Sequence, residues 1–196
     1  MATLKTWISA SRLRTLPLSI SGALIGSSYA YFLGFFDGLI FTLIILTTLS
    51  FQILSNLAND YGDGIKGTDN QSRIGPERAI QSGLVTPKQM RLAVILNALI
   101  STGLAIALIW VSFDFEQLIT STVFVILGGL SIWAAISYTV GDAAYGYRAL
   151  GDFMVFLFFG LLSVFGTFFL FSKQIDIRLL LPASSVGLLS AAVLNL

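Results

Sequence analysis

Two aspartates and two asparagines in the first third of the chain have the spacing of a metal-binding stripe. Their intervals of three and four residues place all four on one face of an α-helix. They are Asn56, Asn59, Asp60 and Asp63. Mg²⁺ in proteins takes one or two carboxylates and completes its shell with water and phosphate oxygens. The spacing therefore predicts a site for one or two Mg²⁺ ions at the end of a helix.

A basic loop follows this stripe and has the composition of an anion site. Lys66, Arg73 and Arg78 can donate charge-assisted hydrogen bonds to phosphate oxygens. Asp69 lies in the same loop and is expected to reach the same metal. We expect Gly62, Gly64 and Gly67 to break the helix and let the backbone approach a ligand. The plainer alternative is a juxtamembrane loop whose acids balance its bases.

A second polar connection carries aromatic and charged side chains that are candidates for substrate binding. They are Tyr138, Tyr145, Tyr147, Arg148 and Asp152. The tyrosines can line the mouth of one cavity together with the acidic stripe, or they can form an aromatic belt at the membrane interface. Asp152 precedes an apolar run, so the role of a helix N-cap competes with a functional one.

The elements that must position these residues are long apolar helices. The chain has 196 residues, of which 56% are hydrophobic and 11% charged, with a mean hydropathy of +0.87. Soluble domains carry about 25% charged residues. Six apolar runs are near the ~20 residues that cross a bilayer as a helix. They are Leu16–Phe36, Leu39–Asn59, Leu92–Phe113, Leu118–Val140, Phe153–Phe171 and Leu179–Leu196. This predicts an all-α, polytopic transmembrane bundle with residues 1–196 in one intramembrane domain.

Basic residues in the connections predict the orientation of this bundle. If six helices alternate in direction, nine lysines and arginines fall on one side of the membrane. They are Lys5, Arg12, Arg14, Lys66, Arg73, Arg78, Lys88, Arg91 and Arg148. Because such residues are retained on the cytoplasmic side, we expect the N-terminus and the acidic stripe there.

The residue types that are missing narrow the chemistry. The sequence has no cysteine and no histidine, which excludes thiolate chemistry, the usual zinc sites and a histidine general base. A metal must then be held by oxygen ligands, which favours Mg²⁺, Ca²⁺ or Mn²⁺.

Three segments in this order resemble the intramembrane aromatic prenyltransferases of the UbiA-type superfamily. They are NLANDYGDGIKGTDN, RIGPERAIQSGLVTP and YTVGDAAYGYRALGDFMVFLFFG. The resemblance covers essentially the whole chain. It is closest to the branch that prenylates 1,4-dihydroxy-2-naphthoate in menaquinone synthesis. In the simplest superfamily motif the last aspartate stands where this chain has Gly67, and the acid here is Asp69, which is usual for that branch.

The resemblance implies Mg²⁺-dependent transfer of a polyprenyl group from a polyprenyl diphosphate to the naphthoate, with loss of CO₂. Asp60 and Asp63 would be catalytic, with the metal held by the four stripe residues and Asp69. Lys66, Arg73 and Arg78 would neutralise the departing diphosphate. The product would be a demethylmenaquinone, made in the bacterial inner membrane, with the lipid bilayer and no nucleic acid as partner.

The resemblance also implies about nine helices and a second aspartate-rich motif. We expect the sequence to be the N-terminal two-thirds of such an enzyme and to be inactive by itself. Three alternatives stay open: a prenyltransferase for another aromatic acceptor, a non-catalytic homologue and a small cation-coupled transporter. Prenyl chain length and oligomeric state are not readable from the residues.

Overall fold

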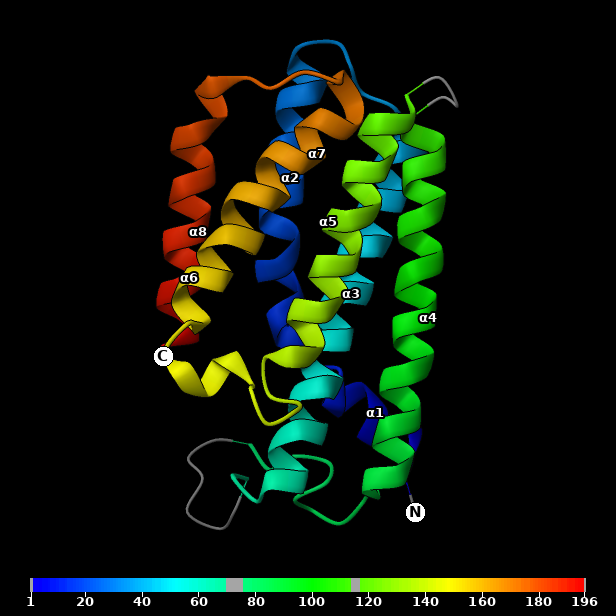
Figure 1. Cartoon of the computed structure of the whole chain (residues 1–196), viewed down its shortest axis with the longest axis vertical. Helices are drawn as coiled ribbons and strands as arrows, with labels where there is room; N and C mark the ends of the chain where they lie inside the picture. The colour runs from blue at the N-terminus through cyan, green and yellow to red at the C-terminus, as the bar shows by residue number, and fades with distance from the viewer. Residues whose placement is uncertain (1, 70–75, 114–116, 196) are drawn as a thin grey trace.

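The protein is a bundle of long helices that run between two ends, as the computed structural model shows (Figure 1). The structure describes residues 2–69, 76–113 and 117–195. The long helices are α2 (Leu16–Phe32), α3 (Gly38–Lys66), α4 (Pro87–Ser112), α5 (Leu118–Ser137), the continuous helix α6–η3–α7 (Gly151–Ser172) and α8 (Leu180–Leu194). The short ones are α1 (Leu4–Ala10), η1 (Leu13–Thr15), η2 (Tyr145–Arg148) and η4 (Ile177–Leu179).

Five of the helices in the described part of the chain are long and apolar enough to cross a membrane. They are α3, α4, α5, α6–α7 and the helix formed by η4 with α8. The sixth long helix, α2, has 17 residues, at the lower end of the length that spans a bilayer. The all-α, multi-pass membrane fold predicted from the apolar runs is confirmed.

The helix α3 continues past the predicted end of its apolar run and carries the acidic stripe on its last turns. It ends at Lys66, and Gly67 takes the left-handed conformation, with φ of 70°, as its C-cap. The expectation that Gly62 and Gly64 also break the helix is wrong. Both stay helical because other segments pack closely over them. A Cβ at Gly62 would lie 2.5 Å from Oγ1 of Thr139, and one at Gly64 would lie 2.7 Å from Cγ2 of Ile80.

Close helix crossings hold α2, α6–α7 and α8 together. A Cβ at Gly26 of α2 would lie 2.6 Å from the carbonyl oxygen of Val164, and one at Gly160 would lie equally near the carbonyl oxygen of Ala183. Small residues of this kind let membrane helices approach backbone to backbone. Gly160 lies in η3, a π-helical segment over Phe156–Leu162. Such segments insert an extra residue and are frequent at functional sites.

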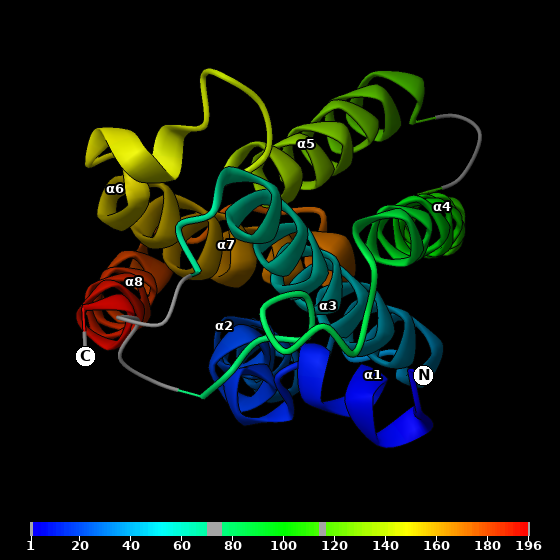
Figure 2. The ribbon, with the colours of Figure 1, turned by 90° about the horizontal axis from the view of Figure 1, so that it is seen from below.

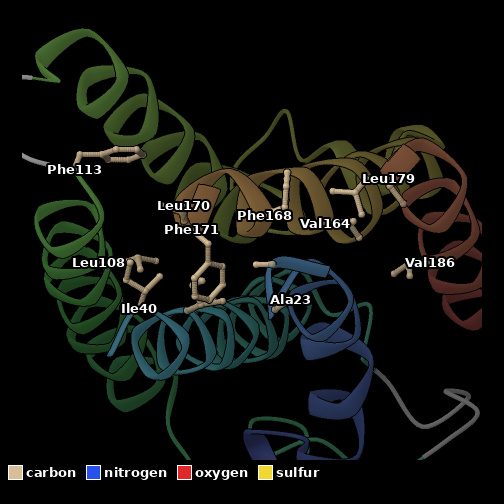
Figure 3. Close-up of a cluster of buried hydrophobic side chains, with 13 residues drawn as sticks. Ala23, Ile40, Leu108, Phe113, Val164, Phe168, Leu170, Phe171, Leu179 and Val186 are labelled. Atoms are coloured by element: carbon tan, nitrogen blue, oxygen red, sulfur yellow. The ribbon is translucent and has the colours of Figure 1, made fainter. Parts of the chain in front are cut away.

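Buried apolar side chains form two clusters at different heights in the bundle. The first joins α2, α3, α4, α7 and α8 and includes Ala23, Ile44, Val164 and Phe168 (Figure 3). The second lies beside the acidic stripe, where Leu54, Leu57 and Ala58 of α3 pack with Val85 and Met90. Through this second cluster, Ala79 and Val85 of the loop before α4 pack against α3.

The polar connections gather at one end of the molecule. Residues 76–86, which precede α4, and residues 138–150, between α5 and α6, both lie at the lower end in Figure 1, together with α1. Seen from that end, α3 is near the centre of the bundle, with the two segments around its terminus (Figure 2). The two connections in which sequence reasoning found candidate residues are therefore neighbours in space.

Candidate functional site

A partly open cavity of about 510 Å³ lies between the helices and is lined by α2, α3, α4, α5, α6–α7 and α8. It follows α3 from Ile44 to Asn59, which at 1.5 Å per residue is about 22 Å. Most of its wall is apolar, with Phe124, Phe158 and Leu170 among the lining residues. The cavity therefore has the length and polarity to hold an extended apolar chain.

Polar side chains line the part of this cavity that lies next to the acidic stripe. Arg12, Arg14, Asn56, Asn59 and Tyr138 all contribute. The two arginines are functional candidates that sequence reasoning missed, since it counted them only as flanking charges. Their signal was the placement of basic residues directly before an apolar helix, which is also the pattern of a membrane anchor.

Asn56 fastens the N-terminal segment that carries these arginines. Its amide nitrogen donates to the carbonyl oxygen of Ser11 at 2.9 Å and to Oγ1 of Thr15 at 3.1 Å. Its amide oxygen accepts from Gln52 at 3.3 Å. Asn56, which the sequence predicted as a metal ligand, therefore holds residues 11–15 in place by hydrogen bonds. Its exposed fraction is only 3%.

Asp60 is buried under the loop that follows α3. Its carboxylate accepts from the backbone N–H groups of Ala79 at 3.1 Å and Ile80 at 3.4 Å, and the residue is 2% exposed. These bonds fix the loop segment that begins with Arg78. The carboxylate predicted to be catalytic thus positions a basic residue of the site.

Asp63 and Asp69 share the guanidinium group of Arg78. Nη1 lies 2.5 Å from Oδ2 of Asp63, and Nε lies 3.2 Å from Oδ2 of Asp69. The same Nη1 donates to the carbonyl oxygen of Asn59 at 3.2 Å. The structure therefore brings together four of the residues predicted from the sequence, in a group that we call the Arg78 cluster: Asn59, Asp63, Asp69 and Arg78.

The second connection closes over this cluster. The hydroxyl of Tyr147 donates to Oδ1 of Asp63, and the hydroxyl of Thr139 donates to Oδ1 of Asn59 at 3.2 Å. Burial, and then the hydrogen bond to Asp63, raise the pKa of Tyr147 above its ordinary value, so the phenol remains a proton donor. Lys66 donates to the carbonyl oxygen of Gly141 at 2.8 Å and lies 4.5 Å from the centre of the Tyr147 ring.

The remaining candidates lie farther from the carboxylates. Tyr145 donates to the carbonyl oxygen of Ala134 at 2.8 Å, and burial raises its pKa to about 12. Its ring and that of Tyr138 pack edge to face at 5.3 Å, and both line the cavity. The exposed residue Arg148 ends η2. Arg73 lies outside the described residues.

Asp152 lies in the first turn of α6, where the N-cap position is taken by Leu150. Its Oδ1 accepts from the amide of Asn195 at 3.0 Å, which ties the start of α6 to the end of α8.

The Arg78 cluster fits a divalent cation in its donor chemistry. No group of three or more acidic side chains that could hold a metal converges within residues 2–69, 76–113 and 117–195. Mg²⁺ needs only one or two carboxylates beside water and phosphate oxygens. Asp63 and Asp69 contact the same guanidinium group, so two carboxylates are available at this place.

Comparison with known proteins gives consistent matches. The sequence model of the UbiA prenyltransferase family matches residues 19–196. The chain is 44% identical over 192 residues to a 1,4-dihydroxy-2-naphthoate octaprenyltransferase of Escherichia coli, covering 98% of this chain and 62% of the relative. Identity to the enzyme of that description from Haemophilus influenzae is 45% over 195 residues, covering 98% and 63%.

A more distant relative has the same description. The 1,4-dihydroxy-2-naphthoate octaprenyltransferase of Mycobacterium tuberculosis is 33% identical over 196 residues, covering 99% of this chain and 63% of the relative. The chain thus spans somewhat less than two-thirds of the length of these relatives. No solved structure matches it.

Proposed function

Because the chain belongs to the UbiA prenyltransferase family, we propose that the protein transfers a polyprenyl group from a polyprenyl diphosphate to 1,4-dihydroxy-2-naphthoate. The allylic carbon–oxygen bond breaks, diphosphate leaves with the electron pair, and a carbon of the electron-rich ring forms the new bond. The carboxylate of the acceptor leaves as CO₂, and the electron pair of its bond to the ring stays with the ring and replaces the pair used for the new bond. The product is a demethylmenaquinone skeleton in its reduced form.

The observation that carries this proposal is the cavity of about 510 Å³ with one polar end. An apolar chain can lie along α3, while its charged head stays near Asn59 and the Arg78 cluster. Asn59 links the two regions, since its side chain lines the cavity and its carbonyl oxygen accepts from Arg78. The cavity also brings aromatic faces such as Phe158 and Phe159 near the reacting chain, and such faces stabilise a cationic prenyl group.

The basic residues at the polar end match the charges of both substrates. Arg78 contacts Asp63 of the acidic stripe, and Lys66 lies over the ring of Tyr147, which also contacts Asp63. We propose that both bind the diphosphate, together with Arg73. Arg12 and Arg14 line the cavity itself and suit the anionic groups of the substrates held inside it. Arginine binds carboxylate and phosphate in the same bidentate geometry.

The proposed cofactor is Mg²⁺, within a family whose members generally use a divalent metal. Asp63 and Asp69 would hold it, and Asp60 with Asn56 and Asn59 would support the surrounding segments or complete the ligand set. A divalent cation supplies Lewis-acid stabilisation of the leaving diphosphate. Tyr147 orients Asp63 by its hydrogen bond, and the connection between α5 and α6 keeps water from the carboxylates.

The protein is a multi-pass membrane protein, and we propose the bacterial inner membrane as its location. Eight lysines and arginines of the described residues belong to α1, the turn before α2, the last turn of α3, the segment before α4, the first turns of α4 and η2. These segments lie at the lower end of the bundle in Figure 1, which supports a cytoplasmic position for the N-terminus and the site. The cavity shared by the long helices supports a single intramembrane domain over residues 1–196.

Purified full-length protein in lipid nanodiscs tests the reaction. We expect prenylated, decarboxylated product from polyprenyl diphosphate and 1,4-dihydroxy-2-naphthoate, detected by mass spectrometry. Activity should disappear with EDTA and return with Mg²⁺. Hydroxybenzoate and homogentisate, offered in competition, test the alternative acceptors. Preferential prenylation of either would reject the naphthoate assignment and keep the family activity.

A further inference from the structure

Arg78 occupies the space between the two carboxylates that a metal would bind. Its contacts to Asp63 and Asp69, at 2.5 Å and 3.2 Å, involve side chains that are mostly buried. Exposed fractions are 14% for Arg78, 12% for Asp63 and 4% for Asp69. Buried carboxylates without a partner are strongly unfavourable, so this pair needs a positive charge when no metal is bound.

Both oxygens of Asp63 are engaged in this arrangement. Oδ2 binds Arg78, while Oδ1 accepts from the hydroxyls of Tyr147 and Thr68, the latter at 3.2 Å. A carboxylate oxygen has two lone pairs, so a cation can bind Asp63 beside these groups and would then lie close to each of them. The hydroxyls are uncharged, whereas the guanidinium group would be repelled by a divalent cation at such a short distance. Arg78 is therefore the group that a metal would displace.

Lys66, which is the other basic residue near the Arg78 cluster among the described residues, does not share this position. The ammonium group of Lys66 donates to the carbonyl oxygen of Gly141 and lies over the ring of Tyr147. The backbone next to Arg78 is fixed by contacts that do not involve the Arg78 side chain. Asp60 binds the backbone of the next two residues, Ala79 and Ile80, so the loop can stay in place while the guanidinium group moves.

We propose that Arg78 is an exchangeable counter-cation. It neutralises Asp63 and Asp69 while no metal is bound, gives way to the divalent cation, and then binds the diphosphate of the incoming substrate. The last step rests on the proposed function, and the first two do not. One consequence is that metal and diphosphate binding reinforce each other, because each favours the same position of Arg78. A permanent loop anchor would behave differently, since its removal would weaken metal binding.

The test measures binding of Mn²⁺ alone to the intact protein in nanodiscs, from the electron paramagnetic resonance signal of free Mn²⁺. Arg78→Gln removes the charge but keeps a polar side chain, and Arg78→Lys keeps the charge. Arg91→Gln is the matched control, because it removes an exposed arginine from the first turns of α4 at the same end. We expect Arg78→Gln to bind Mn²⁺ about 5- to 50-fold more tightly than the wild type, within the usual range of coupling between sites.

Arg78→Lys and Arg91→Gln should bind Mn²⁺ as the wild type does. Unchanged or weaker Mn²⁺ binding by folded Arg78→Gln would overturn the proposal. If Arg78→Gln does not fold, Arg78→Lys is the deciding variant. A lysine keeps the charge but cannot contact both carboxylates as an anchor, so a fall in the Mn²⁺ affinity of Arg78→Lys would equally overturn the proposal. Binding of inorganic diphosphate in the presence of Mn²⁺ should be weaker in Arg78→Gln.

These measurements need no prenyl substrate, so the two proposals fail separately. Tighter Mn²⁺ binding by Arg78→Gln without any prenyl transfer by the wild type would reject the reaction and keep the exchange. Normal prenyl transfer with unchanged Mn²⁺ binding would reject the exchange and keep the reaction.

Discussion

At the scale of single residues, the acidic stripe divides into residues that hold segments and residues that face a charge. Asp60 binds two backbone N–H groups of the loop after α3, and Asn56 binds the segment before α2. Asp63 instead contacts a guanidinium group and two hydroxyls. Four side chains on one helical face thus have different tasks, because each meets a different segment.

Asp63→Asn should remove most of the activity. The substitution keeps the shape of the side chain but loses the negative charge that binds the metal or Arg78. Removing one preorganised charged or polar group from a site typically costs about 10²–10³ in kcat. The measurement is steady-state prenyl transfer, with Mn²⁺ binding in parallel.

Asp37→Asn is the matched control for that variant. Asp37 is the N-cap of α3 at the opposite end and accepts from the N–H groups of Leu39 and Ile40. Asparagine caps helices about as well as aspartate, so activity and stability should both be preserved. Wild-type turnover by Asp63→Asn would show that this carboxylate is not part of the site.

At the scale of elements, the end of α3 is shaped by the segments that pack over it. Gly62 and Gly64 make room for Thr139 and Ile80, one from each polar connection. Both polar connections therefore pack directly against the end of α3. The π-helical segment η3 forms part of the cavity wall, and its residues Phe158 and Phe159 line the cavity.

Gly62→Ala should reduce both stability and activity. The added methyl group would lie 2.5 Å from Oγ1 of Thr139, and overpacking of this kind costs about 1–3 kcal/mol. The displaced connection carries Tyr147, so its hydrogen bond to Asp63 would be disturbed as well. Thermal unfolding in detergent and prenyl transfer are the two readouts.

Gly103→Ala provides the comparison within the same class of substitution. No atom lies within 4 Å of a Cβ built on Gly103 in α4, and alanine favours a helix over glycine by about 1 kcal/mol. We expect wild-type activity and equal or higher stability. Equal losses in both variants would mean that the close contact at Gly62 has no special importance.

At the scale of the whole molecule, the long apolar cavity begins at the polar end of the bundle. The two polar connections before α4 and before α6 lie with α1 at the same end of the bundle (Figure 1). Arg12 and Arg14 follow α1 directly in the chain. The cavity runs from there along α3 between helices that are apolar on their outer faces. This arrangement lets a charged head stay near the membrane surface while an apolar chain remains inside the bundle.

The orientation of the bundle can be tested by labelling single cysteines. These 196 residues contain no cysteine, so an introduced cysteine is the single labelling site among them. Lys88→Cys and Gln174→Cys place exposed thiols at opposite ends. With a membrane-impermeant maleimide on intact cells, or on spheroplasts where an outer membrane blocks the reagent, we expect Gln174→Cys to react at once. Lys88→Cys should react only after permeabilisation, and the reverse pattern would contradict the cytoplasmic position of the site.

The membrane-helical fold could be predicted from the residue pattern alone, and so could the region of the candidate site. Apolar runs of this length must become helices, because backbone groups in lipid have to be hydrogen-bonded within their own segment. The acidic stripe, Arg78 and the tyrosines were recognisable because charged and polar residues are rare in such a chain. These features depend on residue type and on short-range spacing, which are properties of the linear sequence.

Which atoms each candidate residue contacts depends on the packing of distant segments and could not be predicted in this way. Tyr147 reaches Asp63 across 84 positions, Thr139 reaches Asn59 across 80, and Asn56 holds Ser11 across 45. The roles of Arg12 and Arg14 as cavity residues, and of Gly62 as a contact point, follow from the same packing. Such pairings cannot be predicted from local pattern, because they arise when helices far apart in sequence pack side by side and bring their connecting segments together.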